Sequence, residues 1–437
     1  MVERVKKDNV EFVRLQLFDL MGVPKEVIIP VEELEDSLEN GVWFDGSSIE
    51  GFARIQESDL FLKPDIKTYS LLPWLNEGGK TARVICDIYR SDNQPFEDDP
   101  RTVLRKVVQE SRDMGFEYYV GPELEFYLFK KDDSTRTKPI DSGSYFDLNS
   151  YEGYQLIKDI ITALKSFGIS VETSHHEVGI GQYEIDFKYG TALETADRLL
   201  TLKYTVKKIS QMHNIQATFM PKPISGIAGS GMHVHQSLFD IKTGKNLFYN
   251  GDDPYRLSPL AYNFMAGLMK HVKAMAAILC PTVNSYKRLV TGYEAPVYIS
   301  WGSKNRTALV RIPNWFNSKP NSARMELRCP DPTCNPYLSF AVMLKAGLEG
   351  IKHNLQPPKP VEENIFKIDR ESLRIKNIDS LPNSLSDAIS ELKKSSLFAD
   401  VLGKHLFNKY IAIKTKEVGE YHQQVTPWEV EKYLDQF

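Results

Sequence analysis

The chain has 437 residues, of which 42% are hydrophobic and 26% charged, with 26 glycines and 24 prolines. These proportions are typical of globular domains and exclude a wholly disordered or collagen-like chain. At about 100–200 residues per domain, the length predicts two or three domains. A formal net charge of −4 gives no electrostatic support to a nucleic-acid partner.

The four cysteines are too few for a disulfide scaffold and form no CxxC pair, which suits a reducing cytosol. The first residues lack an apolar run of the secretory type, so we expect a cytoplasmic protein. The most apolar long segment, residues 259–280, carries Lys270, His271 and Lys273 near its middle. A membrane span would not tolerate these charges, and we expect no membrane partner.

The first hundred residues alternate apolar and polar side chains in short runs, a pattern that predicts strands. Such runs cover residues 12–18, 26–29 and 82–89. A polar segment with a proline follows at residues 92–100 and is typical of a linker. We therefore expect a small β-rich N-terminal domain over residues 1–98.

Helices and strands alternate in the rest of the chain. Asp99 and Pro100 have the signature of an N-cap followed by a first helical residue. The apolar spacing predicts helices at 154–167, 191–213, 259–279 and 336–354, and strands at 117–129, 183–188, 215–220, 232–238, 297–301, 307–312 and 324–329. These elements predict an α+β chain, with a second domain over residues 99–437 and a helical tail after Pro382.

Several of these strands carry charge in alternation. Glu123 and Glu125 are two residues apart, so they share one face of their strand, while Leu124 and Phe126 share the other. One such pair is most often an exposed strand face. The pattern recurs, however, and the other strands supply Glu184, His233, His235, Ser237, Arg324, Glu326 and Arg328.

A shared cavity would gather these faces into an oxygen-rich site. Besides one or two imidazoles, it would contain the carboxylates of Glu123, Glu125, Glu177, Glu184 and Glu326. Such donors select Mg²⁺ or Mn²⁺ rather than Zn²⁺. Burying the carboxylates without a cation would be prohibitively costly, so the pattern predicts a divalent metal.

A cationic cluster further along the chain comprises Lys287, Arg288, Lys304, Arg306, Arg311, Arg324 and Arg328. Arginine binds phosphate and carboxylate through two parallel hydrogen bonds. Hard metals beside arginines indicate phosphoryl transfer, although surface salt bridges would fit the same cluster. The sequence has no P-loop, no GxGxxG after a strand and no HRD or DFG motif, which disfavours P-loop NTPases, Rossmann enzymes and protein kinases.

The chain resembles the glutamine synthetases of the bacterial and archaeal type I class. The matching stretches occur in the family's order and include WFDGSSI at 43–49, GPELEF at 121–126, HHE at 175–177, QYE at 182–184, GSGMHVH at 229–235, NSYKRL at 284–289, GYEAP at 292–296, NR at 305–306 and ELRCPDP at 326–332. The resemblance implies a small β-grasp-like N-terminal domain and a larger catalytic domain with an open, funnel-like antiparallel sheet and flanking helices. It also implies a homo-oligomer, a dodecamer of two stacked hexamers in which an adjacent subunit contributes the Asp45 loop.

The family motifs assign roles residue by residue. The ligands of one metal match Glu125, Glu177 and Glu184, and those of the other match Glu123, His233 and Glu326. The positions on the ATP side are Glu172, His235, Ser237, Arg306, Arg311 and Arg324. The positions that bind glutamate are Gly229, Arg288, Glu294, Arg306 and Arg328, and those of the ammonium pocket are Asp45, Ser48 and Tyr145.

The implied reaction is the ATP-dependent ligation of ammonia to the γ-carboxylate of L-glutamate through γ-glutamyl phosphate, which gives glutamine, ADP and phosphate. Mg²⁺ or Mn²⁺, two or more ions per site, would be the cofactor, and ATP a co-substrate. Asp45 would take a proton from ammonium, and Glu294, on a flap that closes over glutamate, would take a later one. Arg306 and Arg328 would offset the developing negative charge.

Three positions depart from the family pattern. Ala228 stands where asparagine is usual beside the glutamate site. Thr291 replaces a proline in the flap, and Asn321 occupies a position where some members carry a nucleotide-contacting lysine. None of the three removes a metal ligand.

Segment 377–382 has no tyrosine to adenylylate, and the chain resembles the I-alpha branch of the family. Arg54 matches a feedback-inhibition position of that branch, although an ordinary surface arginine would fit equally well. The resemblance also allows nitrogen-status regulatory proteins as partners.

Two rival functions stay open. The nearer one is a γ-glutamyl ligase that uses a polyamine or ethanolamine; the intact Asp45, Ser48 and Tyr145 argue against it, because a larger amine needs a wider pocket. The other is a catalytically silent structural or regulatory relative. All six metal-ligand positions hold competent residues, which argues against that function too.

Overall fold

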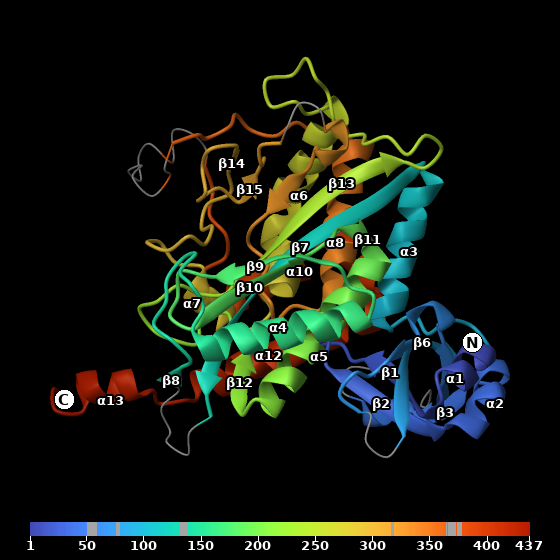
Figure 1. Cartoon of the computed structure of the whole chain (residues 1–437). Coiled ribbons are helices and arrows are strands. Elements are labelled where there is room, and N and C mark those ends of the chain that lie inside the picture. The colour runs from blue at the N-terminus through green and yellow to red at the C-terminus, as the bar shows by residue number, and fades with distance from the viewer. Residues whose placement is uncertain are drawn as a thin grey trace.

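The computed structural model describes residues 1–49, 59–75, 79–131, 138–315, 319–363, 365, 373 and 378–437. One small and one large β-sheet lie side by side, and most of the helices accompany the large sheet (Figure 1). Arg54, the predicted feedback position, lies outside the described residues.

The small sheet forms the N-terminal domain, with the strand order β2-β1-β6-β4-β3 and with β5 paired to β6. The strands are β1 (Val10–Phe18), β2 (Pro24–Pro30), β3 (Val42–Asp45), β4 (Asp59–Pro64), β5 (Ser70–Leu71) and β6 (Lys80–Arg90), accompanied by α1 (Val2–Lys7) and α2 (Leu34–Glu39). β1 and β6 run parallel, and the other pairs are antiparallel. The three strands expected here are confirmed, and their inward-facing apolar side chains form a separate core.

Helix α3 (Pro100–Asp113) begins where the small sheet ends. Asp99 caps it by accepting hydrogen bonds from two backbone N–H groups of its first turn, at 3.3 and 3.0 Å. The buried guanidinium of Arg101 donates to Asp65 at 2.8 Å and to Asp197 at 2.9 and 3.1 Å, and it also contacts Asp87. Since Asp65 and Asp87 belong to the N-terminal domain and Asp197 to α5 (Ala192–Met212), this network ties the two domains together.

The large sheet has the order β14-β15-β16-β13-β7-β10-β9 and is antiparallel except for the pair β14 and β15. Its longest strand, β7 (Phe116–Lys130), also pairs with β8, β11 and β12. The other strands are β8 (Lys138–Pro139), β9 (Val171–His176), β10 (Gln182–Phe187), β11 (Gly190–Thr191), β12 (Ile215–Thr218), β13 (Met232–Asp240), β14 (Trp301–Gly302), β15 (Val310–Arg311) and β16 (Met325–Leu327). Six of the seven strands expected beyond residue 100 are confirmed.

The strand expected at residues 297–301 is wrong, because only its last residue, Trp301, belongs to β14. The residues before it pair with a segment near the end of the chain. The backbone N–H of Ile299 donates to the carbonyl of Asp379 at 2.8 Å, and that of Leu381 donates to the carbonyl of Val297 at 2.8 Å. The run is extended, but its partner lies outside the sheet, and apolar periodicity does not encode the partner.

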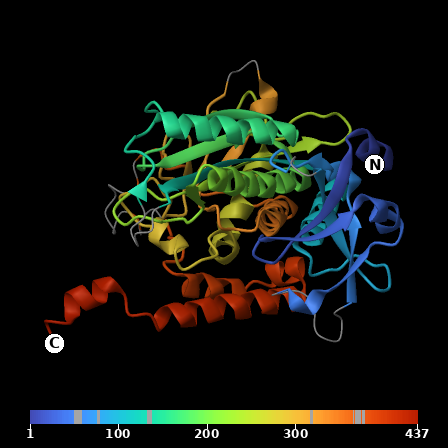
Figure 2. The same cartoon turned by 60° about the horizontal axis from the view of Figure 1, so that its bottom comes forward.

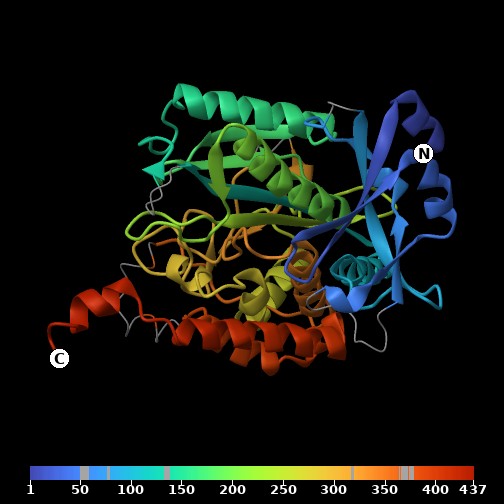
Figure 3. The same ribbon diagram turned by 90° about the horizontal axis from the view of Figure 1, so that it is seen from below.

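Helices pack beside the large sheet. The long helices α6 (Pro259–Leu279) and α8 (Pro336–Lys352) pack along each other, α10 (Leu385–Lys393) packs on α6, and α4 (Tyr151–Ser166) packs on α5. The remaining helices are α7 (Ser285–Arg288), α11 (Ser396–Leu402), α12 (Lys404–His422) and α13 (Pro427–Tyr433). Figures 2 and 3 show α12 along one edge of the body and α13 standing away from it. The four expected helices and the helical tail are confirmed.

The apolar segment at residues 259–280 forms α6, which lies between α8 and α10. Most of its side chains are buried in the main core of the protein. Within the described ranges, no helix combines the length and the apolar character that crossing a membrane requires.

Candidate functional site

Three neighbouring strands carry charged side chains on one face of the large sheet. β7 holds Glu123 and Glu125, and because successive strand residues point to opposite faces, the two carboxylates share one face. Glu184 of β10 lies opposite Glu125, and His233 of β13 lies opposite Glu123. The strand register therefore brings together residues that are far apart in the sequence.

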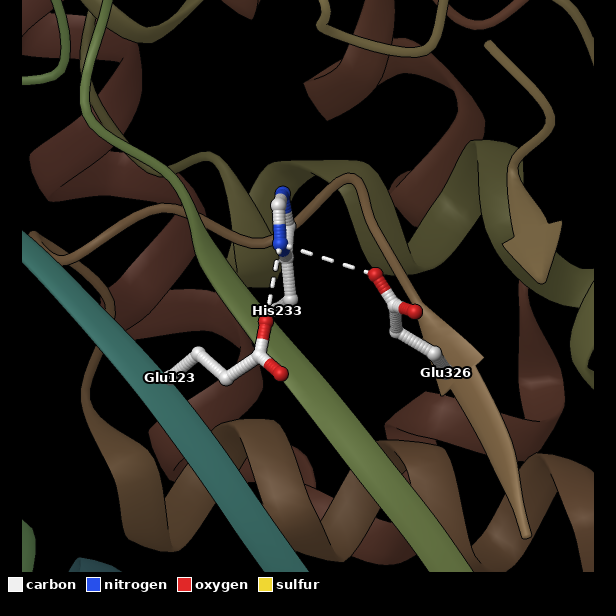
Figure 4. A group of neighbouring side chains, drawn as sticks. All are labelled: Glu123, His233 and Glu326. Carbon is white, nitrogen blue, oxygen red and sulfur yellow. Dashed lines mark hydrogen bonds and ion pairs between the residues drawn. The ribbon is translucent and has the colours of Figure 1, made fainter. Parts of the chain in front are cut away.

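Glu123, His233 and Glu326 form a group that could hold a metal ion, with one donor atom from each within 4.8 Å of the others. Nδ1 of His233 lies 3.2 Å from Oε2 of Glu123 and 3.6 Å from Oε1 of Glu326. Figure 4 shows the three side chains pointing toward one another from β7, β13 and β16. The structure thus brings together all three residues of one predicted ligand set.

Glu326 is buried and paired with two arginines. Its carboxylate accepts a hydrogen bond from Nη1 of Arg311 at 2.9 Å and another from Nη1 of Arg328 at 2.5 Å. Burial acts to raise the pKa of Glu326, but the charge of Arg328, together with two histidines, outweighs it and holds the pKa below its ordinary value. The carboxylate is therefore ionised and available as a ligand.

Glu123 is kept ionised by histidines. Its Oε1 lies 2.6 Å from Nε2 of His235, and its other oxygen faces His233. Burial acts to raise the pKa of Glu123, but the charge of His235 and the hydrogen bonds of both histidines overcome it, so the pKa lies well below its ordinary value.

Glu125 and Glu184 are in the opposite situation. Burial, followed by the charge of Glu177, raises the pKa of Glu125, although its Oε2 accepts two hydrogen bonds of 2.9 Å. Burial, followed by the charge of Asp186, raises the pKa of Glu184. These two buried carboxyl groups hold their protons when no cation is present, and a divalent ion is what would stabilise them as anions.

A second group that could hold a cation comprises His175, Glu184 and Asp186. Nε2 of His175 lies 2.9 Å from Oε1 of Glu177 and 3.7 Å from Oε1 of Glu184, so the imidazole stands between two predicted ligands. Within the described ranges, Glu125, Glu177 and Glu184 do not form such a group by themselves. The family motifs assign neither Asp186 nor His175, the first residue of the HHE stretch at 175–177, to a metal. The only signal for Asp186 is its alternation with Glu184 along β10, and His175 depends on the pairing of β9 with β10.

A cavity of about 300 Å³ borders Glu123. Four of the residues expected on the nucleotide side line it: Glu172, His235, Ser237 and Arg324. Nε of Arg324 lies 3.3 Å from Nδ1 of His235, so the imidazole stands between Arg324 and Glu123. Asn321 also lines this cavity, whereas Arg311 does not and pairs with Glu326 instead.

A second cavity, of about 440 Å³, borders His233. Its lining includes most of the residues expected to bind glutamate, namely Gly229, Arg288, Glu294 and Arg328, together with Glu125 and Glu177. Ala228 lines it too, and the carbonyl of Ala228 accepts a hydrogen bond from the Tyr127 hydroxyl at 2.6 Å. The backbone at this departure from the family pattern is therefore held in place without an asparagine side chain.

Arg288 is buried in the wall of the second cavity. Its Nη1 donates to the carbonyls of Cys329 at 2.8 Å and Pro330 at 3.2 Å, and its Nη2 donates to that of Arg328 at 3.1 Å. A Cβ atom on Gly231 would lie 2.5 Å from Nη2 of Arg288, so this close approach requires glycine. Arg288 thus shapes the wall by holding the backbone that follows β16.

Tyr145, from the predicted ammonium pocket, lies beside His175. Its ring stacks on Phe146 with centroids 4.2 Å apart and meets the His175 ring edge-on at 5.6 Å. Burial, followed by the charge of Glu177, raises the pKa of Tyr145, while the charge of the exposed Arg306 acts in the opposite direction. Arg306 is therefore near enough to Tyr145 for its charge to act on the phenol.

Asp45 and Ser48 lie away from the rest of the predicted site. Asp45 ends β3 in the N-terminal domain, which Figure 1 shows well apart from β9 and β15. Its exposed carboxylate accepts hydrogen bonds from the N–H and hydroxyl of Ser47 at 2.9 and 2.7 Å and from the hydroxyl of Ser48 at 3.0 Å. These hydrogen bonds, those of Ser47 first, lower the pKa of Asp45 and keep it ionised.

Comparisons with known proteins cover the whole chain. A family model described as the glutamine synthetase catalytic domain matches residues 97–433, and one described as the glutamine synthetase β-grasp domain matches residues 9–91. A glutamine synthetase of Clostridium saccharobutylicum is 49% identical over 439 residues, which is 100% of this chain and 98% of the relative. A glutamine synthetase of Methanocaldococcus jannaschii is 48% identical and covers 99% of this chain and 97% of its own.

Solved structures agree with this relationship. A chain named GmaS, in complex with ADP, superposes with a TM-score of 0.90 at 32% identity and covers 99% of both chains. The glutamine synthetase of Plasmodium falciparum gives a TM-score of 0.89 at 29% identity, with 99% of this chain and 98% of its own covered. The expected β-grasp domain and larger catalytic domain are thereby confirmed. The chain belongs to the glutamine synthetase family, whose members use ATP and divalent metal ions, and it is a glutamate–ammonia ligase.

Proposed function

We propose that this chain makes glutamine on the face of the large sheet that carries Glu123, His233 and Glu326, where Glu123 borders one cavity and His233 the other. The observation that supports this location is the convergence of these three side chains, with Arg311 and Arg328 bound to Glu326. Ligands for hard cations beside arginines suit phosphoryl transfer to a carboxylate, because its catalysis consists mainly of charge neutralisation and positioning.

We assign two divalent ions, Mg²⁺ or Mn²⁺, to the ligand sets Glu123, His233 and Glu326, and Glu125, Glu177 and Glu184. The residues fit such ions, since oxygen donors predominate and no thiol is among them. Burial keeps Glu125 and Glu184 protonated without a cation, so an ion would relieve the cost of their ionisation. When bound, the ions would neutralise phosphate charge and orient the phosphoryl group.

ATP is assigned to the cavity of about 300 Å³ and glutamate to the cavity of about 440 Å³. Both border the metal ligands, so the γ-phosphate and the γ-carboxylate would meet between them. Within the described ranges, the buried Nε of Arg328 has no hydrogen-bond partner. An anionic group at the end of the glutamate cavity would provide one.

The residues then divide the chemistry between them. A γ-carboxylate oxygen attacks the γ-phosphorus, ADP leaves, and Arg306 offsets the charge of the transferred group. Asp45 accepts a proton from ammonium, and the resulting ammonia attacks the acyl carbon. Arg328 stabilises the tetrahedral adduct, Glu294 accepts the second proton, and the C–O bond to phosphate breaks to release glutamine.

We propose that the Asp45 and Ser48 of each site come from an adjacent subunit, because the same chain holds them far from its own metal ligands. The assembly would be a cytoplasmic dodecamer of two stacked hexamers, as the family resemblance implies. The proposed domains are residues 1–98 and 99–437; the family matches end at residue 91 and begin again at residue 97, so the proposed boundary lies two residues inside the second match. Feedback control through Arg54 and binding of nitrogen-status regulatory proteins complete this proposal.

The test is phosphate and glutamine release from ATP, Mg²⁺ and L-glutamate with no amine, ammonium, ethanolamine or a polyamine. We expect both products only when ammonium is present. Turnover with a larger amine alone would establish the rival γ-glutamyl ligase and direct attention to Ala228 and Thr291. A protein that binds the metal but turns over no amine would be a silent relative.

A further inference from the structure

Lys222 lies under the ring of Tyr293 at the edge of the glutamate cavity. Its Nζ is 3.6 Å from the ring centroid and also donates a hydrogen bond to the carbonyl of Ile227. Burial lowers the pKa of Lys222. A partly desolvated ammonium against an aromatic face makes a stronger cation–π contact than an exposed one.

The contact joins two stretches of the chain that border the same cavity. Ile227 and the two residues after it, which follow Lys222, form one rim, and Gly292 to Ala295 form another. The backbone of Lys222 is itself fixed, because its N–H donates to Oδ1 of Asn284 at 2.8 Å and its carbonyl accepts from Nδ2 of the same residue at 3.1 Å. These hydrogen bonds hold the backbone of Lys222 in a fixed position beside the cavity.

The rim that carries Tyr293 is exposed at Thr291, Gly292 and Glu294 and is anchored in the main core at Ala295. Gly292 has a φ of +96°, a conformation that glycine adopts readily. The side chain of Glu294 is exposed, and its carbonyl accepts a long hydrogen bond of 3.4 Å from Nη2 of Arg328. The cation–π contact joins Tyr293 of this segment to Lys222, beside the other rim.

We propose that Lys222 is a positioning residue that holds Tyr293, and with it the segment around Glu294, closed over the glutamate cavity. The role rests on the proposed function, in which this segment covers an activated glutamate. Lys222 touches neither the metal ligands nor the reacting atoms; it acts through Tyr293. It ties down a flap whose own sequence has Thr291 where the family usually has a proline.

Loss of this contact has a definite chemical consequence. Water that enters the open cavity attacks the acyl carbon of γ-glutamyl phosphate, the C–O bond to phosphate breaks, and a proton passes to solvent. Glutamate is regenerated and phosphate is released, so the net reaction is hydrolysis of ATP to ADP and phosphate without glutamine. The ratio of phosphate to glutamine therefore reports how well the flap is held.

The experiment measures both products in one reaction for the parent, Lys222→Met, Lys222→Arg, Tyr293→Leu and Tyr293→Phe, in the full-length oligomer. We expect Lys222→Met and Tyr293→Leu to raise the phosphate-to-glutamine ratio and to raise the KM for glutamate about fivefold, while the KM for ATP changes less. The conservative variants, which keep a cation or a ring, should lie closer to the parent. Lys63→Met is the matched control, because Lys63 makes a cation–π contact of 5.2 Å with Tyr89 outside both cavities.

The double variant Lys222→Met/Tyr293→Leu should be no worse than either single variant, because both remove one contact. A parent-like product ratio and glutamate KM in Lys222→Met, or additive effects in the double variant, would overturn the role. If Lys222→Met fails to assemble, Tyr293→Leu still tests the contact, because it removes the ring and leaves Lys222 in place. A parent that makes no glutamine at all would instead overturn the proposed function.

Discussion

Glu184 on β10 lies directly opposite Glu125 on β7, and both carboxyl groups are buried. Because burial raises the pKa of each above its ordinary value of 4.5, the metal-free folded protein retains protons there that the unfolded chain releases. Stability of the metal-free protein should therefore be undiminished below pH 4.5 and fall as pH rises, by about 1.4 kcal/mol per pH unit for each retained proton.

Glu184→Gln should distinguish two effects of the Glu184 carboxylate, its destabilisation of the metal-free protein and its binding of the metal ion. In chelator, the variant should be more stable than the parent by up to about 3 kcal/mol at pH 7, and the gain should vanish near pH 4.5. With Mg²⁺ or Mn²⁺ the order should reverse, since the parent alone has the complete ligand set. Thermal unfolding with and without metal measures both effects, and the exposed Glu39→Gln is the control. A metal-free variant that is less stable than the parent at pH 7 would contradict the argument.

Asp141→Asn should weaken the hairpin that carries Glu177. Oδ1 of Asp141 lies 2.8 Å from Nε2 of the buried His176, and its other oxygen accepts from the Tyr183 hydroxyl. Burial acts to raise the pKa of Asp141, but the hydrogen bond with His176 and that from Tyr183 overcome it and lower the pKa to about 2 from 3.8. The stabilisation, about 2 kcal/mol, is present above pH 3.8 and lost as pH falls through 2.

His176 sets the upper end of the pH range in which its hydrogen bond with Asp141 stabilises the fold. Burial acts to lower the pKa of His176, but the hydrogen bond with Asp141 raises it above 6.5, so its share of the stabilisation is lost as pH rises through that higher value. The free energy of unfolding of Asp141→Asn should therefore differ most from the parent between pH 3.8 and 6.5. Chemical denaturation at several pH values measures the difference, and one that is constant with pH would exclude an ionic origin.

Arg101→Met should cost about 3–5 kcal/mol, because it leaves several carboxylates at the domain junction without their buried partner. Arg112→Ala is the matched control. Arg112 also pairs with a carboxylate, that of Glu117 at 3.0 Å, but its side chain is exposed, and such pairs contribute at most about 1 kcal/mol. Urea unfolding of both variants makes the comparison, and equal losses would show that Arg101 does not link the domains.

Asp45→Ala should reduce ammonium-dependent glutamine formation at least about a hundredfold and leave metal binding unchanged, since Asp45 is assigned as a base and not as a ligand. Reassembly with Glu326→Gln subunits should restore activity, because some sites then combine an intact cavity with a neighbour's intact Asp45. In randomly mixed rings at equal amounts these make up about a quarter of all sites. Mixed rings without activity would place both residues in one subunit's site.

The alternation of charge along β7, β13 and β16 predicted that Glu123, His233 and Glu326 face one cavity, because strand geometry places every second side chain on one face, and the family motifs grouped them as the ligands of one metal. The same reasoning did not find His175, since its place opposite Glu184 depends on the pairing of β9 with β10. Register between strands is set by the packing of the whole sheet and leaves little trace in one strand's sequence.

The sequence motifs identify functional residues but do not show which contacts these residues make in the folded chain. Sequence resemblance assigns Arg288 to glutamate, but it does not reveal that its guanidinium holds three backbone carbonyls. The WFDGSSI motif identifies Asp45, yet the distance of that loop from the metal ligands follows from how the two domains pack. Lys222 lies outside the strands in which every second residue is charged, so the sequence pattern does not indicate a role for it. Its contact with Tyr293 is visible only in the folded structure.

Arg101, by joining the two sheets, also fixes the direction in which a subunit offers its Asp45 loop relative to its own cavity. In the proposed assembly each subunit gives that loop to one neighbour and receives one from the other, which is a head-to-tail contact. Such contacts close only when the turn from one subunit to the next is a whole fraction of a circle. The angle between the sheets helps to set that turn, because it determines where the Asp45 loop lies relative to the cavity of the same subunit. A loosened junction should therefore appear in electron micrographs as open arcs or rings of the wrong size, even while each subunit stays folded.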